Sequence, residues 1–128
     1  MASSIRELPE LIVTVDDVVY TPHLEAPSDR PYPMVYFITI SNEGLEAVTI
    51  KGRKWVVRDS NGETIAVEGD GVVGEFPRIE PGQSFSYNSY HIIGSDSVAE
   101  GAFLGVTDNG EAVFTRIPKF EMRVPDIN

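Results

Sequence analysis

The chain has 128 residues, the size of a single domain spanning 1–128, and a chain of this length can bury an ordinary hydrophobic core without a metal or disulfide. It contains no cysteine, which excludes disulfides, thiolate metal sites and cysteine nucleophiles and favours a cytoplasmic protein. Twenty acidic against ten basic residues give a net charge of −10, which argues against nucleic-acid and membrane partners, and no apolar run approaches the roughly 20 residues that span a bilayer.

The first third of the chain predicts two strands joined by a loop. The segment 11–20 carries apolar residues on one face, but Asp16 and Asp17 interrupt it, which indicates a bulge or an edge strand. Four prolines between positions 22 and 33 predict a loop. Residues 34–40 begin apolar on both faces, as expected of a strand that is covered on both sides.

A further strand and a hairpin are predicted next. Over 47–58, Trp55 shares one strand face with Val57, while Lys54 lies on the other, so Trp55 is the expected core anchor. The pair Asn61-Gly62 is the strongest hairpin signal, because both residues tolerate the positive φ of a primed turn. The hairpin leads into a strand over 63–68.

Turn signals divide the second half of the chain into strands. Pro81-Gly82 precedes a strand over 84–88, and the turn at 108–110 separates strands over 102–106 and 112–117. Helical spacing is absent. Seven to eight short strands with regular turns predict an all-β fold, namely an antiparallel β-sandwich of immunoglobulin or fibronectin type III type.

The stretch 69–74 has the sequence GDGVVG and spells G-x-G-x-x-G, the pattern that binds the pyrophosphate of dinucleotides. That function needs a helix after the third glycine, yet the eight residues after Gly74 include two prolines and a glycine. The Gly-Lys-Ser/Thr ending of a P-loop is also missing. We therefore interpret the glycines as residues that permit positive φ and close backbone approach in a turn between strands.

A glycine-rich turn can still direct several backbone amides at an anion without a helix. Four basic residues of the strand that precedes the hairpin, at positions 51, 53, 54 and 58, could lie beside the turn. This arrangement predicts a hypothetical anion site formed by Gly69, Gly71, Gly74, Arg53 and Lys54. The alternative is that the basic residues belong to a solvated sheet face and are balanced by nearby acids.

No catalytic constellation stands out in the sequence. His23 and His91 are far apart and neither has a metal-ligand spacing, so each is expected to be an exposed or packing residue. No serine lies in G-x-S-x-G or S-x-x-K. Acids at 68, 70 and 75 could supply oxygen ligands, but their spacing matches no calcium loop. We expect no catalytic residues, no cofactor and no metal site.

An ordered series of motifs resembles the ApaG domain family. The motifs are RKWVVRD at 53–59, NG at 61–62, VEGDGVVGEFP at 67–77, IEPGQSFSYNS at 79–89 and IPKF at 117–120. The resemblance covers residues 11–124, which we expect to be the core of the domain. One departure is Lys54, where the family usually has a histidine before the tryptophan.

The resemblance implies a fibronectin-type-III-like sandwich and an association with cobalt resistance and magnesium efflux. Family members also occur as modules of eukaryotic F-box proteins, which implies protein–protein interaction. We therefore expect a non-catalytic binding module with an unidentified protein partner. The alternative is a binder of pyrophosphate or a dinucleoside polyphosphate at the glycine-rich turn. The sequence leaves open whether the protein is a monomer or a homodimer.

Overall fold

The computed structural model describes residues 4–126, and the regular elements in that range are all strands. They are β1 (Arg6–Glu7), β2 (Leu11–Tyr20), β3 (Tyr32–Asn42), β4 (Val48–Asp59), β5 (Thr64–Asp70), β6 (Arg78–Ile79), β7 (Ser84–Ile93), β8 (Ser97–Thr107) and β9 (Ala112–Met122). The predicted all-β fold is confirmed. The described residues include no helix long and apolar enough to cross a membrane.

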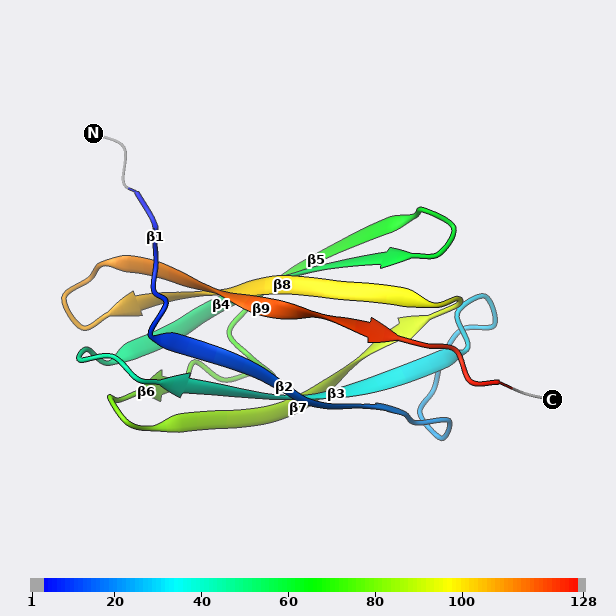
Figure 1. The fold of residues 1–128 in the computed structure, drawn as a ribbon, viewed down its shortest axis with the longest axis horizontal. Coiled ribbons are helices and arrows are strands. Elements are labelled where there is room, and N and C mark those ends of the chain that lie inside the picture. Colours follow the sequence, from blue (N-terminus) through cyan, green and yellow to red (C-terminus); the bar gives the residue numbers. More distant parts are fainter. Residues whose placement is uncertain (1–3, 127–128) are drawn as a thin grey trace.

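The strands form two sheets that pack face to face as a β-sandwich (Figure 1). One sheet has the order β2-β3-β7, and the other has the order β1-β9-β8-β4-β5, with β6 paired to the start of β4. The described pairs are antiparallel except β1 with β9. Three strands of the smaller sheet therefore face the four longer strands of the other sheet. This arrangement is consistent with a sandwich of the immunoglobulin or fibronectin type III class.

The core lies between the sheets and is built from alternating residues of each strand. Trp55 is 1% exposed and Phe103 is fully buried, and both lie in one cluster with Ile38 of the smaller sheet. Lys54 and Arg58 alternate with the buried positions of β4 and are exposed. The prediction that Trp55 anchors the core is therefore confirmed.

The strand β2 has the predicted irregularity. Its pairing with β3 shifts register between Val15 and Asp17, which is a bulge, and β2 is also an edge strand of its sheet. Asp16 and Asp17 are exposed there. An edge position tolerates the interruption because one side of the strand has no ladder to break.

The hairpin after β4 is confirmed, but the predicted primed turn is wrong. Of its residues only Gly62 has a positive φ, at 88°. The Gly62 amide donates to the Asp59 carbonyl, and the Asp59 amide donates to the Glu63 carbonyl, so the loop holds three residues. The Asp59 carboxylate accepts hydrogen bonds from the amides of Asn61 and Glu63, which stabilises this wider turn.

Several strands are longer than the sequence predicts, among them β7, β8 and β9, which ends at Met122 instead of 117. β7 extends from 88 to Ile93 and β8 begins at Ser97, because each is paired along its length with a long neighbour despite weak local signals. A bulge between Ala99 and Gly101 interrupts β8 opposite β9. A Cβ on Gly101 would meet the Lys54 carbonyl oxygen, so glycine permits the close approach of β4 and β8.

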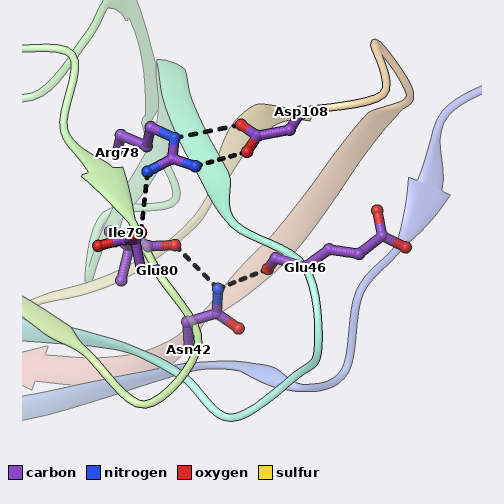
Figure 2. Close-up of polar contacts among 6 residues, drawn as sticks. All are labelled: Asn42, Glu46, Arg78, Ile79, Glu80 and Asp108. Carbon is purple, nitrogen blue, oxygen red and sulfur yellow. Dashed lines mark hydrogen bonds and ion pairs between the residues drawn. The ribbon is translucent and has the colours of Figure 1, made fainter.

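The chain that leads from the glycine-rich turn to β7 is held by a polar cluster (Figure 2). The fully buried Asn42 donates through Nδ2 to the carbonyl oxygens of Glu46 at 2.7 Å and Ile79 at 2.9 Å. The Arg78 guanidinium forms a bidentate pair with the Asp108 carboxylate. These contacts fix β6 against the β3–β4 turn and the β8–β9 turn.

Candidate functional site

The glycine loop, residues 69–76, contains a tight turn after β5. Val73 and Gly74, with φ of 45° and 80°, occupy the two central positions between Val72 and Glu75. Val72 and Glu75 exchange backbone hydrogen bonds of 2.8 and 3.0 Å. A primed two-residue turn therefore lies here, and the fully buried Val72 anchors it in the core.

Each glycine of the motif meets a geometric need. Gly71 has φ of 62°, and a Cβ there would clash with the Glu75 carbonyl oxygen. A Cβ on Gly69 would lie 2.7 Å from the Arg53 guanidinium, while Gly74 has positive φ. Positive φ and close approach are the conditions expected of a structural turn.

Several amide groups of the loop already have partners inside the protein. The Gly71 amide donates to the Lys51 carbonyl at 2.8 Å, and the amides of Val72 and Glu75 are used in the turn. The Val73 and Gly74 amides have no hydrogen-bond partner among the described residues. Only this adjacent pair of the turn thus remains available to an anion.

Arg53 and Lys54 point to opposite faces of β4. The Arg53 Nη1 donates to the carbonyl oxygens of Asp70 at 2.8 Å and Gly71 at 3.2 Å, so this side chain holds the glycine loop. The Lys54 Nζ lies 3.6 Å from the Glu68 carboxylate in an exposed ion pair. The basic charge nearest the loop is therefore already engaged with its carbonyl groups.

The predicted anion-site residues come together only in part. Arg53, Lys54 and Gly69 line an open depression of about 700 Å³, whereas Gly71 and Gly74 are not among its lining residues. Lys51, Glu68 and Asp70 also line it. The two carboxylates offset two of the three cations, so only a small net positive charge is left to attract pyrophosphate.

A second depression lies between the edge strands β5 and β7. This β5–β7 cleft has a volume of about 250 Å³. Tyr36, Trp55 and His91, from three different strands, line it together with Ile65 and Val67 of β5. It therefore opens on one edge of the sandwich, where each sheet ends.

The charged lining of the β5–β7 cleft is entirely basic. Arg30 and Arg53 line it, and no aspartate or glutamate does. Among the described ion pairs, none involves Arg30 or Arg53. In a chain with twice as many acids as bases, the cleft itself is therefore positive, while the depression that shares Arg30 with it is lined by Asp29, Asp59 and Glu63.

An aromatic cluster lies at the inner end of the β5–β7 cleft. The ring centroids of Tyr36 and Trp55 are 4.9 Å apart, and the His91 ring lies 4.8 Å from each of them. Phe120 of β9 closes the cluster, with its ring 5.8 Å from Trp55. The tilted and edge-on packing of these rings fixes the side chains in place.

Polar atoms of the same cluster lack partners. Among the described residues, Trp55 Nε1, His91 Nε2 and the Tyr87 hydroxyl are buried without a hydrogen bond. Burial lowers the pKa of His91 to about 4, so its imidazole is neutral at pH 7. Burial raises the pKa of Tyr36, an effect that a hydrogen bond with Ser89 partly offsets. The cleft thus offers neutral polar groups beside two permanent cations.

This cleft was not among the sites predicted from the sequence. Trp55 was expected in the core and lies there, and His91 was expected to be an exposed or packing residue, of which the packing role is confirmed. The polar residue Ser89 on the inward face of β7 was a possible signal, because it interrupts the series of aromatic residues at 85, 87 and 91. Without the register between β3 and β7, that signal could not be assigned to a neighbour.

The acids considered for a metal do not form a centre. Glu68 is paired with Lys54, whereas Asp70 and Glu75 carry no ion pair among the described contacts. Within residues 4–126 no group of three or more histidine, aspartate or glutamate side chains is arranged to hold a metal ion.

Comparison with known proteins gives one consistent match. The family model of the ApaG domain matches residues 22–105. The chain is 39% identical to Protein ApaG of Shewanella woodyi over 122 residues, which cover 92% of this chain and 97% of that protein. It is 38% identical to Protein ApaG of Xanthobacter autotrophicus over 109 residues, 84% of each chain. The X-ray structure of the structural-genomics target SoR45 superposes with a TM-score of 0.83 and 32% identity, covering 93% of this chain and 90% of that one.

Proposed function

Because the chain belongs to the ApaG domain family, we propose that it is a non-catalytic binding module that recognises a protein partner along strand β5. The observation that carries the proposal is the unpaired edge of β5. The strand is last in its sheet, and six of its seven residues are exposed.

The edge of β5 has the features of a peptide-binding strand. Its outer backbone groups have no neighbouring strand, so an extended peptide can add to the sheet through main-chain hydrogen bonds. Ile65 and Val67 are 44% and 42% exposed and face the β5–β7 cleft, so they provide apolar contact beside that edge. In Figure 1 the β4–β5 hairpin lies at one side of its sheet, and among the described strands β5 pairs with β4 alone, so its other side is open to an added strand.

A binding role without catalysis fits the polar groups of the sandwich. The described histidines do not lie together, since His91 is in the β5–β7 cleft and His23 is exposed in the β2–β3 loop. His91 touches aromatic rings rather than a serine nucleophile or an acid that would orient it. The family association with cobalt resistance and magnesium efflux suggests divalent-cation homeostasis as the setting of the partner.

The alternative function is pyrophosphate or dinucleoside polyphosphate binding at the glycine loop. The observation in its favour is the pair of unbonded amides at Val73 and Gly74. A cation is also near the loop, since the Lys51 Nζ lies 5.8 Å from the centroid of the Phe76 ring. The geometry supports it less than the first function. Arg53 already serves the loop carbonyls, and two carboxylates line the adjoining depression.

Photo-crosslinking in the native host tests the protein-binding proposal. A photoreactive amino acid is placed at Val67 in the β5–β7 cleft and, as a matched control, at Val98 on the outward face of β8, which is 40% exposed. We expect one discrete protein adduct from position 67 and none from 98. The adduct is identified by mass, and the interaction is then reproduced with the two purified proteins.

The same experiment defines the result that opposes the proposal. Absence of an adduct at position 67, or the same adduct pattern from 67 and 98, would mean that β5 is not a specific recognition edge. An adduct of twice the mass of the chain would identify the partner as a second copy and settle the choice between monomer and homodimer.

A further inference from the structure

We propose that the β5–β7 cleft is a carboxylate-binding pocket that receives an acidic side chain from an extended segment of the partner, paired along β5. The inference rests on the proposed function, because it names the chemistry by which that partner is recognised. It assigns a ligand to the cleft between the sheets, whereas the glycine loop has no part in it.

The charge of the cleft selects an anion. Arg30 and Arg53 are its charged residues, whereas the chain as a whole carries a net charge of −10. The charge of Arg53 acts on the inner end, where it opposes the rise that burial causes in the pKa of Tyr36 and Tyr87. A guanidinium in a partly buried site attracts a carboxylate more strongly than one at the open surface.

The guanidinium of Arg53 is also held in a fixed place. Its Nη1 is bonded to the carbonyl oxygens of Asp70 and Gly71, while Nε and Nη2 have no partner among the described residues. The remaining donors are therefore positioned by the loop without being used by it. A guanidinium fixed in this way loses little conformational freedom when it binds a carboxylate.

A second donor at the inner end lacks an acceptor. Trp55 is 1% exposed, it lines the cleft, and its Nε1–H has no hydrogen bond. Buried donors normally have partners, because an unpaired one has lost its hydrogen bond to water. A carboxylate accepts hydrogen bonds and cannot donate them, so its oxygens suit both Trp55 and Arg53.

The size and position of the cleft identify the occupant. Its volume of about 250 Å³ is below the roughly 300 to 1,000 Å³ of pockets for drug-sized ligands, so it fits one side chain better than a nucleotide. A peptide strand paired with β5 directs every second side chain to the inner face of the sheet. That is the face from which Ile65 and Val67 enter the cleft.

A peptide titration of the full chain labelled with ¹⁵N tests the pocket. The protein has a single tryptophan, so the Trp55 indole N–H gives one resolved signal. The probe is acetyl-Thr-Val-Glu-Val-Thr-amide, and the control is the same peptide with glutamine in place of glutamate. We expect a saturable shift of the indole signal with the glutamate peptide and about tenfold weaker binding of the glutamine peptide, since a hydrogen bond to a charged group is the stronger.

Three variants connect the preference to the cleft. Arg53→Gln should abolish the tenfold preference, but this change also removes contacts to the glycine loop. Arg30→Gln removes the second cation without touching a described side-chain hydrogen bond, and it should reduce the preference at least threefold while the spectrum stays folded. Lys54→Gln, on the outer face of β4, should leave the preference unchanged.

The outcomes separate this inference from the proposed function. Equal affinity for the two peptides, or shifts confined to the outer faces, would overturn the carboxylate pocket even if a protein adduct forms at position 67. If N-acetylglutamate binds as tightly as the peptide, the ligand is a free organic acid and the peptide occupant is overturned. A glutamate preference together with no protein adduct would retain the pocket and overturn the protein-binding function.

Discussion

The glycine loop and the β5–β7 cleft lie on either side of Arg53 and differ in what they leave unsatisfied. In the loop, three amides donate to backbone carbonyl groups, Gly71 and Gly74 have positive φ, and a Cβ on Gly71 would clash with backbone. In the cleft, Trp55 and His91 carry buried polar atoms without partners, and two arginines have no carboxylate. The loop pairs three of its amides internally and leaves those of Val73 and Gly74 unpaired at its turn, whereas the unpaired polar atoms of the cleft are buried.

The comparison shows that the most recognisable sequence motif of the chain is not its best candidate for a binding site. A glycine pattern is conspicuous in a sequence because backbone geometry is written in neighbouring residues. A cleft between two sheets draws its groups from strands far apart in the chain.

Gly71→Ala should be the most damaging change in the loop. We expect a loss of about 3 to 5 kcal/mol in the free energy of unfolding, because the new Cβ combines positive-φ strain with a clash against the Glu75 carbonyl. Urea unfolding measures it. Gly74→Ala is the matched control, since its Cβ would meet nothing within 4 Å, and it should cost only about 1 kcal/mol. Equal losses at both sites would refute a steric role for Gly71.

Acid should lower the free energy of unfolding, because the buried imidazole of His91 in the cleft resists protonation. The unfolded imidazole binds a proton near pH 6.5 and the folded one only near pH 4, so stability is full above pH 6.5 and falls as the pH drops toward 4. The loss amounts to at most about 3 kcal/mol. The groups that face the ring are Tyr36 from β3 and Trp55 from β4, and neither supplies a negative charge at these pH values.

Unfolding in urea at several pH values between 4 and 7.5 checks this dependence. His91→Phe should flatten the curve over that range, because the variant has no imidazole to protonate, whereas His23→Gln, in an exposed loop, should leave it unchanged. An unaltered slope in His91→Phe would show that other groups cause the acid sensitivity.

Arg53→Gln should lower the free energy of unfolding by less than the protonation of His91 does, and it should also loosen the glycine loop. Loss of the hydrogen bonds to the carbonyl oxygens of Asp70 and Gly71 is expected to lower the free energy of unfolding by about 1 to 2 kcal/mol. Faster amide hydrogen exchange at Gly71 would accompany it. Lys54→Gln removes only an exposed ion pair and should be close to neutral. If Lys54→Gln is the more costly, Arg53 does not connect the two regions.

Pyrophosphate should have the smallest effect of all. We expect no saturable shift in melting temperature at millimolar pyrophosphate or diadenosine tetraphosphate, with or without magnesium or cobalt. The carboxylates of Glu68 and Asp70 offset two of the three cations of the adjoining depression, and Arg53 is already bonded to loop carbonyl groups. A saturable shift that Gly74→Ala abolishes would favour the glycine loop as the binding site.

The sequence predicted the framework of the fold because local patterns determine it. Alternation in β4 identified Trp55 as buried, and the pair Asp16-Asp17 marked the bulge in β2. The turn type at Asn61-Gly62 was wrong, because the Asp59 carboxylate bonds two amides there and selects a wider loop. Dipeptide propensity does not include that competition.

The cleft could not be predicted, because it depends on register and on the stacking of the sheets. Tyr36 and His91 become neighbours only when β3 and β7 pair, and Trp55 joins them only when the sheets pack. The hairpin predicted from the sequence does place Arg53 opposite Gly69 in the β4–β5 ladder. Alternation placed Lys54 on the face opposite Trp55, as the structure has it, but it could not show that the Arg53 guanidinium would bond the carbonyl groups of Asp70 and Gly71.

The most direct test of the account compares the two regions with one chemical probe. The photoreactive amino acid is placed at Val67 in the β5–β7 cleft or at Val73 in the glycine loop, two valines that are 42% and 48% exposed. Recognition along β5 should give a discrete protein adduct from position 67 and none from position 73. An adduct from position 73 with none from position 67 would contradict it and return recognition to the glycine loop.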